Sequence, residues 1–349
     1  MGKSTLSIPI LKNNFESVLE INADEKKYQN VLSSTDLNQL KRLVSGYKIL
    51  FIDEAQRIQN IGLNLKILHD NIPELKIIAT GSSSFELANQ ISEPLTGRTW
   101  IYKLFPISLM EFSNFLNPFE LDEKLQEFLI FGMYPEVFNY ENALDKMDYL
   151  KHLTESFLYK DLLELKQIKN SAKIYDLLRL LAFQIGSPVS FNELGRKLGL
   201  STDTVISYID LLEKVFVVYR LGGFSKNLRK EITKNKKVFF YDIGVRNALI
   251  EDYSLPDERP DIGALWENFI ISERLKRNSY LRAHVNSFFW RTYTGAELDY
   301  VEQGSGKLSG VEIKWENKKP KVPKSWKENY PDSEFKPVNK ENYQDFVIR

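Results

Sequence analysis

Two adjacent carboxylates stand where a buried strand is expected to end, and together they could serve phosphoryl transfer. The run Lys48–Asp53 (KILFID) is short and almost continuously apolar, which predicts a strand buried on both faces of a parallel sheet. Phosphoryl transfer needs one carboxylate in the magnesium shell and a second that orients the attacking water. Ligands bind at the carboxyl ends of such strands, so Asp53 suits the first task and Glu54 the second. A solvated acidic turn is the alternative interpretation.

The first residues of the chain could hold the phosphates that this chemistry needs. The stretch GKST matches the end of the pattern G-x-x-x-x-G-K-[ST], in which backbone amides cradle phosphates at a helix N-terminus. In that arrangement the lysine reaches the β and γ phosphates, and the Ser4 hydroxyl joins Asp53 as a magnesium ligand. We therefore predict a site for ATP and Mg²⁺, although an ordinary polar N-terminus has the same residues. The predicted nucleotide ligands are Gly2, Lys3, Ser4 and Thr5.

Two more polar residues follow along the chain and could complete the same site. Lys76–Thr80 (KIIAT) predicts another buried strand, and the Gly-Ser-Ser-Ser turn behind it places Ser82 where a polar group can sense the γ phosphate. A Ser-rich helix cap explains this turn equally well. Arg98, at the end of the stretch LTGR, could reach the nucleotide of a neighbouring subunit and stabilise transition-state charge, which predicts a homo-oligomer. A surface arginine is the alternative.

A group of acids near the C-terminus suggests metal-dependent hydrolysis of phosphodiesters. Asp299, Glu312 and Lys314 follow the spacing D-x12-E-x-K. Residues two apart on a strand share a face, so Glu312 and Lys314 would point the same way, towards Asp299 on the neighbouring strand. We predict that Asp299 and Glu312 bind a divalent cation, that Lys314 assists water attack, and that Glu267 adds a third carboxylate. The alternative is a solvated strand, on which E-x-K alternation is common.

A helix-turn-helix pattern with a basic stretch lies between these two groups. Phe191–Leu198 and Thr202–Glu213 follow helical spacing, and apolar segments that flank a basic stretch predict the strands of a wing. Such a basic stretch could neutralise DNA phosphates, while the start of the second helix could read base edges. A packing module with a solvated basic hairpin is the alternative. The predicted DNA contacts are Thr202, Thr204, Tyr208, Lys226, Arg229 and Lys230.

The elements that must position the first site alternate between strand and helix. Strands are predicted at Ser17–Asn22, Lys48–Asp53 and Lys76–Thr80, and helices at Leu37–Val44 and Ile61–Asn71. This alternation argues for a doubly wound α/β sheet.

The remainder of the chain predicts three further parts. Residues 108–181 follow helical spacing, and the acidic stretch 251–262, with two prolines, is typical of a linker. A helix is then expected at Ala264–Lys276, followed by three strands, Ser287–Arg291, Glu297–Val301 and Gly310–Ile313. The expected fold class is therefore an α/β multidomain protein.

Composition excludes several other classes of protein. The chain has 349 residues, no cysteine and three histidines, which excludes disulfides and thiolate zinc sites and argues against a histidine-based metal site. No apolar run approaches the roughly 20 residues of a membrane span, and no signal peptide follows Met1. We therefore expect a cytoplasmic protein without membrane contact. The net charge of +0 excludes a protein that is basic throughout, but it allows a local basic patch.

Nine stretches taken together resemble the prokaryotic AAA-type P-loop ATPases that carry a C-terminal domain of unknown function. Their order and spacing cover essentially the whole chain. They are ILFIDEAQRI (49–58), ATGSSSFEL (79–87), LTGR (95–98), FPISLMEF (105–112), FGMYPEV (131–137), LGRKLGLSTDTVISYIDLLE (194–213), KVFFYDIGVRNAL (237–249), WENFIISE (266–273) and GAELDYV (295–301).

The resemblance implies five parts and a leading function. The parts are an AAA-type ATPase core (1–112), a helical arm (113–182), a winged helix-turn-helix (183–249), a linker (250–262) and a domain like the PD-(D/E)XK restriction-endonuclease fold (263–349). The leading function is ATP binding and hydrolysis, coupled to a DNA-facing C-terminal half. The rivals are a non-catalytic DNA-binding module and a metal-dependent nuclease with a regulatory ATPase half.

One departure from that group concerns the start of the chain. Members of the group begin earlier, with a strand and a complete loop of the form G-P-R-Q-V-G-K-[ST], of which this chain has only the part from Gly2 onward. We therefore expect a truncated reading frame, a late start codon or a degenerate copy, with a parallel sheet that lacks its first strand and weak ATP binding by this chain.

Overall fold

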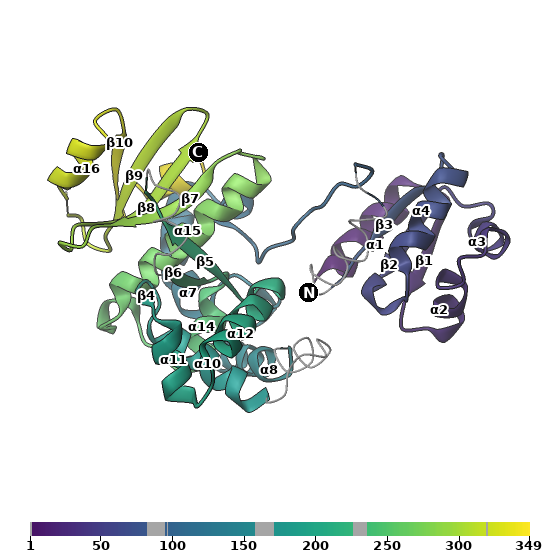
Figure 1. The fold of residues 1–349 in the computed structure, drawn as a ribbon, viewed down its shortest axis with the longest axis horizontal. Helices are drawn as coiled ribbons and strands as arrows, with labels where there is room; N and C mark the ends of the chain where they lie inside the picture. The colour runs from purple at the N-terminus through teal and green to yellow at the C-terminus, as the bar shows by residue number, and fades with distance from the viewer. Residues whose placement is uncertain (1, 82–94, 96, 158–170, 226–235, 319) are drawn as a thin grey trace. The chain divides into compact units, whose positions relative to one another are not determined.

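The structure is a computed structural model of the chain and describes residues 2–81, 95, 97–157, 171–225, 236–318 and 320–349. The chain divides into two compact units, unit 1 (Met1–Leu104) and unit 2 (Phe105–Arg349) (Figure 1). Each unit has its own sheet and its own apolar core.

Unit 1 is a three-stranded parallel sheet covered by helices. Its strands β1 (Val18–Asn22), β2 (Ile49–Asp53) and β3 (Lys76–Ala79) lie side by side in that order. The predicted α/β alternation is confirmed, because helices occupy the intervening segments. These helices are α1 (Lys3–Asn14), α2 (Lys26–Leu32), α3 (Leu37–Val44), the short 3-10 helix η1 (Ala55–Arg57) and α4 (Ile61–Asn71).

Strand β2 is the centre of this unit and is buried on both faces. Ile49 and Phe51 pack with Leu11 of α1 on one face. Leu50 and Ile52 belong to a larger cluster that includes side chains of α3 and α4 on the other face. Because successive residues of a strand point to opposite faces, burial on both sides requires the continuous apolar run seen in the sequence.

Unit 2 begins with helices and continues into a mixed sheet of seven strands. The order of the strands is β10-β9-β8-β7-β5-β6-β4 (Figure 1). The helices are α6 (Leu109–Phe112), α7 (Pro118–Phe131), η2 (Pro135–Asn139), α8 (Ala143–His152), η3 (Leu153–Phe157), α10 (Ser171–Phe183), α11 (Phe191–Leu198), α12 (Thr202–Lys214), α14 (Ile243–Ile250), η4 (Pro256–Glu258), α15 (Ile262–Tyr280), α16 (Lys324–Asn329) and α17 (Tyr343–Val347). The strands are β4 (Pro188–Val189), β5 (Val218–Gly223), β6 (Lys236–Phe240), β7 (Asn286–Arg291), β8 (Glu297–Gly304), β9 (Lys307–Ile313) and β10 (Glu334–Val338).

The seven-stranded sheet joins the helix-turn-helix region to the C-terminal region. Strand β5 pairs antiparallel with β6 and, on its other side, parallel with β7. The parallel pairing aligns Gly222 with Phe288 and Gly223 with Phe289. Beyond it, the backbone N–H of Phe224 donates to the carbonyl of Phe289 at 2.6 Å. The two regions, for which the sequence predicted separate domains, therefore share one hydrogen-bonded sheet.

The predicted linker between these regions is packed rather than extended. Arg259 is only 4% exposed, and its guanidinium pairs with the carboxylate of Asp261 at 2.9 Å. Asp261 also forms an ion pair with Arg246 of α14, whose Nη2 lies 2.6 Å from Asp261 Oδ2. This buried ion cluster fixes the start of α15 against α14. Within the described residues, no helix is long and apolar enough to cross a membrane.

Candidate functional site

The carboxylate of Asp53 gathers hydroxyl groups from two other segments of unit 1. The Ser4 hydroxyl donates to Asp53 Oδ2 at 2.5 Å, and the Thr80 hydroxyl donates to Asp53 Oδ1. The backbone N–H of Glu54 also donates to Oδ1, at 3.1 Å. Segments that lie 49 and 27 residues away in the sequence thus meet at one side chain.

The fold explains why these three side chains meet. Asp53 is the last residue of β2, and Thr80 directly follows β3, whose Ala79 lies beside Ile52 in the parallel register. The backbone N–H of Thr80 donates to the Ile52 carbonyl at 2.8 Å, which holds Thr80 at the end of β2. Helix α1 brings Ser4, in its first turn, to the same edge of the sheet.

The start of α1 offers unpaired backbone donors next to Asp53. Gly2 is the N-cap, with φ 74° and no capping side chain, and its carbonyl accepts the first helical hydrogen bond, from Leu6. The amides of Lys3, Ser4 and Thr5 therefore have no acceptor within the helix, and they carry the positive end of its dipole. An anion is the natural ligand of such a helix end.

Glu54 lies beside Asp53 but turns away from the strand. Its backbone is left-handed, with φ 53°, so its side chain does not continue the alternation of β2. The carboxylate accepts a hydrogen bond from Gln56 Nε2 at 2.5 Å. Asp53 and Glu54 thus have different partners, as expected if the two carboxylates have different tasks.

The donors around Asp53 fit a magnesium ion. Ser4 and Asp53 supply adjacent hard oxygen atoms, the ligands that Mg²⁺ prefers. No ion pair between described residues involves Asp53, so no cationic side chain balances its charge there. Among the described residues of unit 1, the ion pairs are Lys12–Glu20, Lys27–Glu25, Arg57–Asp24 and Arg98–Asp70.

Two other residues predicted for this site have different outcomes. Ser82 lies outside the described residues. Arg98 pairs with Asp70 of α4, with Nη1 3.2 Å from Oδ1, and both side chains are about two-fifths exposed. Thr80, a described residue directly after β3, contacts Asp53. Its signal in the sequence is a hydroxyl residue at the end of a strand, although β3 is half-buried or exposed along its length and not buried as expected.

The acids of the C-terminal region also come together, at one end of the sheet in unit 2. The Lys314 ammonium lies 2.7 Å from Glu312 Oε1 and 3.4 Å from Asp299 Oδ2. Asp299 Oδ2 accepts a further hydrogen bond from the backbone N–H of Ile313 at 2.8 Å. Val311 and Ile313 are buried, as the strand alternation requires.

Glu267 of α15 joins this centre through Lys237, which lies at the end of the basic stretch in the sequence and to which the sequence analysis gave no separate role. Lys237, in β6, lies 3.0 Å from Glu267 Oε1 and 2.7 Å from Glu297 Oε1. Burial and the nearby Asp299 raise the pKa of Glu267 to about 8. Burial opposes the charge of Lys237, but Glu267 and Glu297 outweigh burial and raise its pKa to about 12.

This centre fits a metal ion poorly, because its carboxylates already have cationic partners. We define it as the C-terminal acidic centre, made of Glu267, Glu297, Asp299 and Glu312 with Lys237 and Lys314. The described residues contain no group of three or more acidic or histidine side chains placed to hold a metal ion. Each of the four carboxylates instead has an ammonium group within 3.4 Å.

The helix-turn-helix region has the predicted helices, α11 and α12, separated by Gly199–Ser201. Thr202 is exposed at the start of α12, and the Thr204 hydroxyl lies 2.8 Å from that of the N-cap Ser201. Tyr208 is only 5% exposed and packs in the core, so its prediction as a DNA contact is wrong. Lys226, Arg229 and Lys230 lie outside the described residues.

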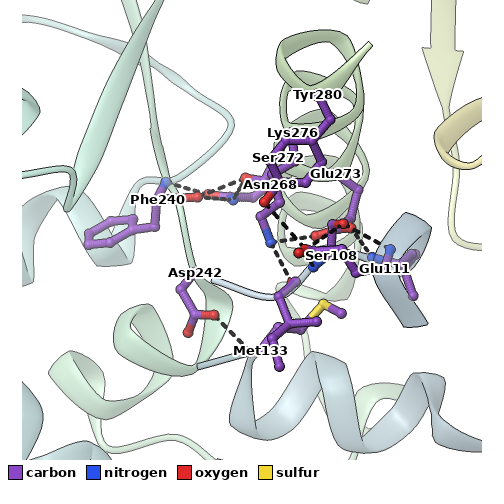
Figure 2. A network of polar contacts seen from close by, with 12 residues as sticks. Ser108, Glu111, Met133, Phe240, Asp242, Asn268, Ser272, Glu273, Lys276 and Tyr280 are labelled. Atoms are coloured by element: carbon purple, nitrogen blue, oxygen red, sulfur yellow. Dashed lines mark hydrogen bonds and ion pairs between the residues drawn. The ribbon is translucent and has the colours of Figure 1, made fainter. Parts of the chain in front are cut away.

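A buried polar network ties α15 to the segment that opens unit 2 (Figure 2). Glu273 accepts the backbone N–H of Leu109 at 2.6 Å and pairs with Lys276 at the same distance. Lys276 also donates to the Ile107 carbonyl at 3.1 Å. Asn268 bonds both backbone groups of Phe240 in β6, at 2.8 Å each. Stretches that the resemblance singled out therefore hold unit 2 together.

Comparisons with known proteins match the chain in three parts. Residues 1–113 match a family described as AAA domain, residues 122–255 a domain of unknown function (DUF8612), and residues 262–346 another (DUF4143). The N-terminal part of the chain is thus AAA-like.

Several relatives match along most of the chain. An uncharacterized protein of Mycobacterium tuberculosis is 27% identical over 317 residues, which cover 90% of this chain and 68% of the relative. An uncharacterized protein of Methanocaldococcus jannaschii is 24% identical over 326 residues, 88% of this chain and 70% of the relative. One of Haemophilus influenzae is 24% identical over 314 residues, 86% and 75% respectively. No solved structure matches the chain significantly.

Proposed function

We propose that unit 1 binds ATP with Mg²⁺ and hydrolyses it. The observation that carries the proposal is the convergence of the Ser4 and Thr80 hydroxyls on the Asp53 carboxylate, beside the free amides of α1. The match of residues 1–113 to an AAA domain supports the same chemistry.

Each residue of this site has a separate role in the proposal. The first-turn amides of α1 and the Lys3 ammonium bind phosphate oxygens, and Ser4 and Asp53 hold the metal. The metal, when bound, neutralises charge on the β and γ phosphate oxygens. Glu54 orients the attacking water, and Thr80 keeps the Asp53 carboxylate in place.

A single substitution tests the proposal. Asp53→Asn keeps the size of the side chain but removes the charge that would hold Mg²⁺, so it should lower the affinity for MgATP by about tenfold or more. The matched control is Asp24→Asn, an exposed aspartate on the loop after β1. Titration calorimetry with MgATP measures both. Equal affinity in the parent and Asp53→Asn, or no detectable affinity in the parent, would remove the proposal.

A neighbouring subunit completes the ATP site in this proposal. Arg98 would exchange its half-exposed partner Asp70 for the nucleotide of that subunit. Mixing Arg98→Ala chains with Glu54→Gln chains should recover part of the turnover that each variant loses. Confirmed subunit exchange without recovery would exclude the role in trans.

A second candidate function, DNA binding by unit 2, is favoured by its helix-turn-helix geometry. Helices α11 and α12 precede the antiparallel pair β5–β6, and Thr202 is exposed at the start of α12. This order of elements supports the proposal of a winged helix, in which the basic stretch lies between the two strands in the sequence. Fluorescence anisotropy with duplex DNA at several salt concentrations tests it. Replacing Lys226, Arg229 and Lys230 by Ala should weaken binding and flatten the salt dependence. Unchanged binding would exclude this surface.

A further inference from the structure

Lys237 is the least exposed member of the C-terminal acidic centre. Its side chain is 1% exposed, whereas that of Lys314 is 40% exposed. Its ammonium lies against Glu267 and Glu297 and also faces the ring of Phe289, 5.4 Å from the ring centroid. A lysine is almost never buried so completely unless it is paired, so these carboxylates are the condition of its burial.

The lysine and its partners come from different regions of unit 2. Lys237 belongs to β6, within the region that matches DUF8612, whereas Glu267 and Glu297 belong to the region that matches DUF4143. The hydrogen-bonded neighbours β5, β6 and β7 hold these regions in one sheet, and Asn268 of α15 binds the backbone of β6 three residues beyond Lys237. Strand β6, held by these hydrogen bonds, therefore positions the Lys237 ammonium next to carboxylates of the other region.

We propose that the C-terminal acidic centre is an ion-pair lock between the two regions rather than a metal site. The Lys237 ammonium joins Glu267 to Glu297, and the Lys314 ammonium faces Asp299 and Glu312, the residues to which the sequence hypothesis assigns a divalent cation. Between Lys237 and Lys314, every carboxylate of the centre faces an ammonium group. A cation would have to displace these groups to reach the oxygens. The centre then holds the two regions together and cleaves no phosphodiester bond.

One buried oxygen of the centre has no hydrogen-bond partner in the described part of the chain, which bears on whether a metal ion could bind there. Glu312 Oε2 is buried and has no hydrogen-bond partner among the described residues. Mg²⁺ requires near-octahedral coordination by about six oxygen atoms, and the two ammonium groups already occupy one oxygen each of Glu267, Asp299 and Glu312. A metal that used Asp299 Oδ2 would have to displace the Lys314 ammonium and the Ile313 amide.

Manganese binding separates the lock from a metal site. Without nucleotide, the loss of the free Mn²⁺ signal in electron paramagnetic resonance counts the ions bound by the full chain. We expect the parent and Asp299→Asn to bind the same number of ions. One more ion in the parent than in Asp299→Asn would overturn the proposal, as would Mn²⁺-dependent DNA cleavage that Asp299→Asn abolishes.

Removing the lysine tests the lock directly. Lys237→Met keeps the aliphatic stem but leaves Glu267 and Glu297 unpaired, so the midpoint of thermal unfolding should fall by about 10 °C. Lys236→Met, one residue earlier and on the opposite face of β6, is the matched control and should change the midpoint far less. Millimolar Mn²⁺ should then raise the midpoint of Lys237→Met, but not that of the parent. Equal midpoints for the two Lys→Met variants would overturn the lock.

A double variant covers the case in which Lys237→Met does not fold. Lys237→Met with Glu267→Gln removes the unpaired carboxylate together with the ammonium, so it should recover folded protein and much of the lost thermal stability. A double variant no more stable than Lys237→Met would show that Glu267 is not the partner that matters, and the proposal would fail.

Discussion

Asp53 in unit 1 is half-buried and Asp299 in unit 2 is buried, and each lies on an inner strand of its sheet. Their carboxylates, however, have different hydrogen-bond and ion-pair partners. The carboxylate of Asp53 accepts hydrogen bonds from two hydroxyls, which satisfy its oxygens without cancelling its charge. The carboxylate of Asp299 accepts a backbone amide and faces the Lys314 ammonium. Neutral donors leave a site receptive to a cation, and ammonium groups close it. The partners of an acid therefore decide its chemistry more than the acid does.

The largest expected effect concerns the second carboxylate of unit 1. Glu54→Gln keeps the shape of the side chain but cannot orient water as a base, so ATP turnover should fall by about 10²–10³-fold while MgATP affinity is kept. Single-turnover hydrolysis and calorimetry measure the two quantities separately. Glu74→Gln, an exposed glutamate before β3, is the control. If Glu54→Gln hydrolysed ATP at the parental rate, Glu54 would have no role in catalysis. The proposed difference between the acids of unit 1 and the ion-paired acids of unit 2 would then be contradicted.

The next effect tests whether ion pairs in unit 2 serve stability. Burial opposes the charge of Glu302, but Arg274, at 2.7 Å, together with Asn278 and Tyr300, outweighs burial and lowers the pKa of Glu302. Glu302→Gln should therefore cost about 3 kcal/mol of unfolding free energy at neutral pH.

The pH dependence of that loss has a defined sign. A carboxyl group with a lowered folded-state pKa stabilises the protein above its unfolded pKa of about 4.3, and this contribution disappears as the pH falls through the folded value. The difference between the parent and Glu302→Gln in urea unfolding should thus be constant between neutral pH and about pH 6, and it should shrink below about pH 4. A difference that grows on acidification would contradict the lowered pKa.

A smaller effect should follow loss of one hydroxyl beside Asp53. Thr80→Val preserves the branched shape and removes the hydrogen bond to Oδ1, worth about 1.5 kcal/mol for a charged acceptor, so MgATP affinity or turnover should fall about tenfold. Thr99→Val, at an exposed threonine, serves for comparison. If both variants retain parental affinity and turnover, the hydroxyl does not help position the carboxylate.

The smallest effect is expected at an exposed ion pair. Arg98 and Asp70 are about two-fifths exposed, so water screens their attraction, and Arg98→Ala should change the unfolding free energy by less than about 1 kcal/mol. Urea unfolding monitored by tryptophan fluorescence measures this change. A loss comparable to that of Glu302→Gln would mean that Arg98 is a structural residue, and its proposed role in a neighbouring site would lose its basis.

Local patterns predicted strand β2 well, because it is buried on both faces, whereas β1 and β3 are partly exposed. A run such as KILFID fits few other structures, and the carboxylates at its end follow from the chain direction. The contact of Thr80 with Asp53 could not be predicted in this way, because only the parallel register of β2 and β3 places Thr80 beside Asp53.

Unit 2 shows where such patterns fail. Lys237 counted as one basic residue among several, since its acidic partners lie 30 and 60 residues further along the chain. Tyr208 was mistaken for a surface residue, although its spacing of three from the buried Val205 places both on one face of α12. Strand β10 and helices α16 and α17 were not predicted. These features depend on pairing between residues distant in the sequence and on the orientation of helices in the fold. A short stretch of sequence does not determine either of them.

The pairing of β5 with β7 also determines where proteolysis or recombination could divide such a chain. A fragment that ended between residues 255 and 262 would leave β5 in one piece and β7 in the other, each with a row of unpaired amides and carbonyls. Exposed edges of that kind template aggregation. Recombination or limited proteolysis should therefore tolerate a break between Leu104 and Phe105, where the compact units meet in sequence, far better than one between the two regions of unknown function.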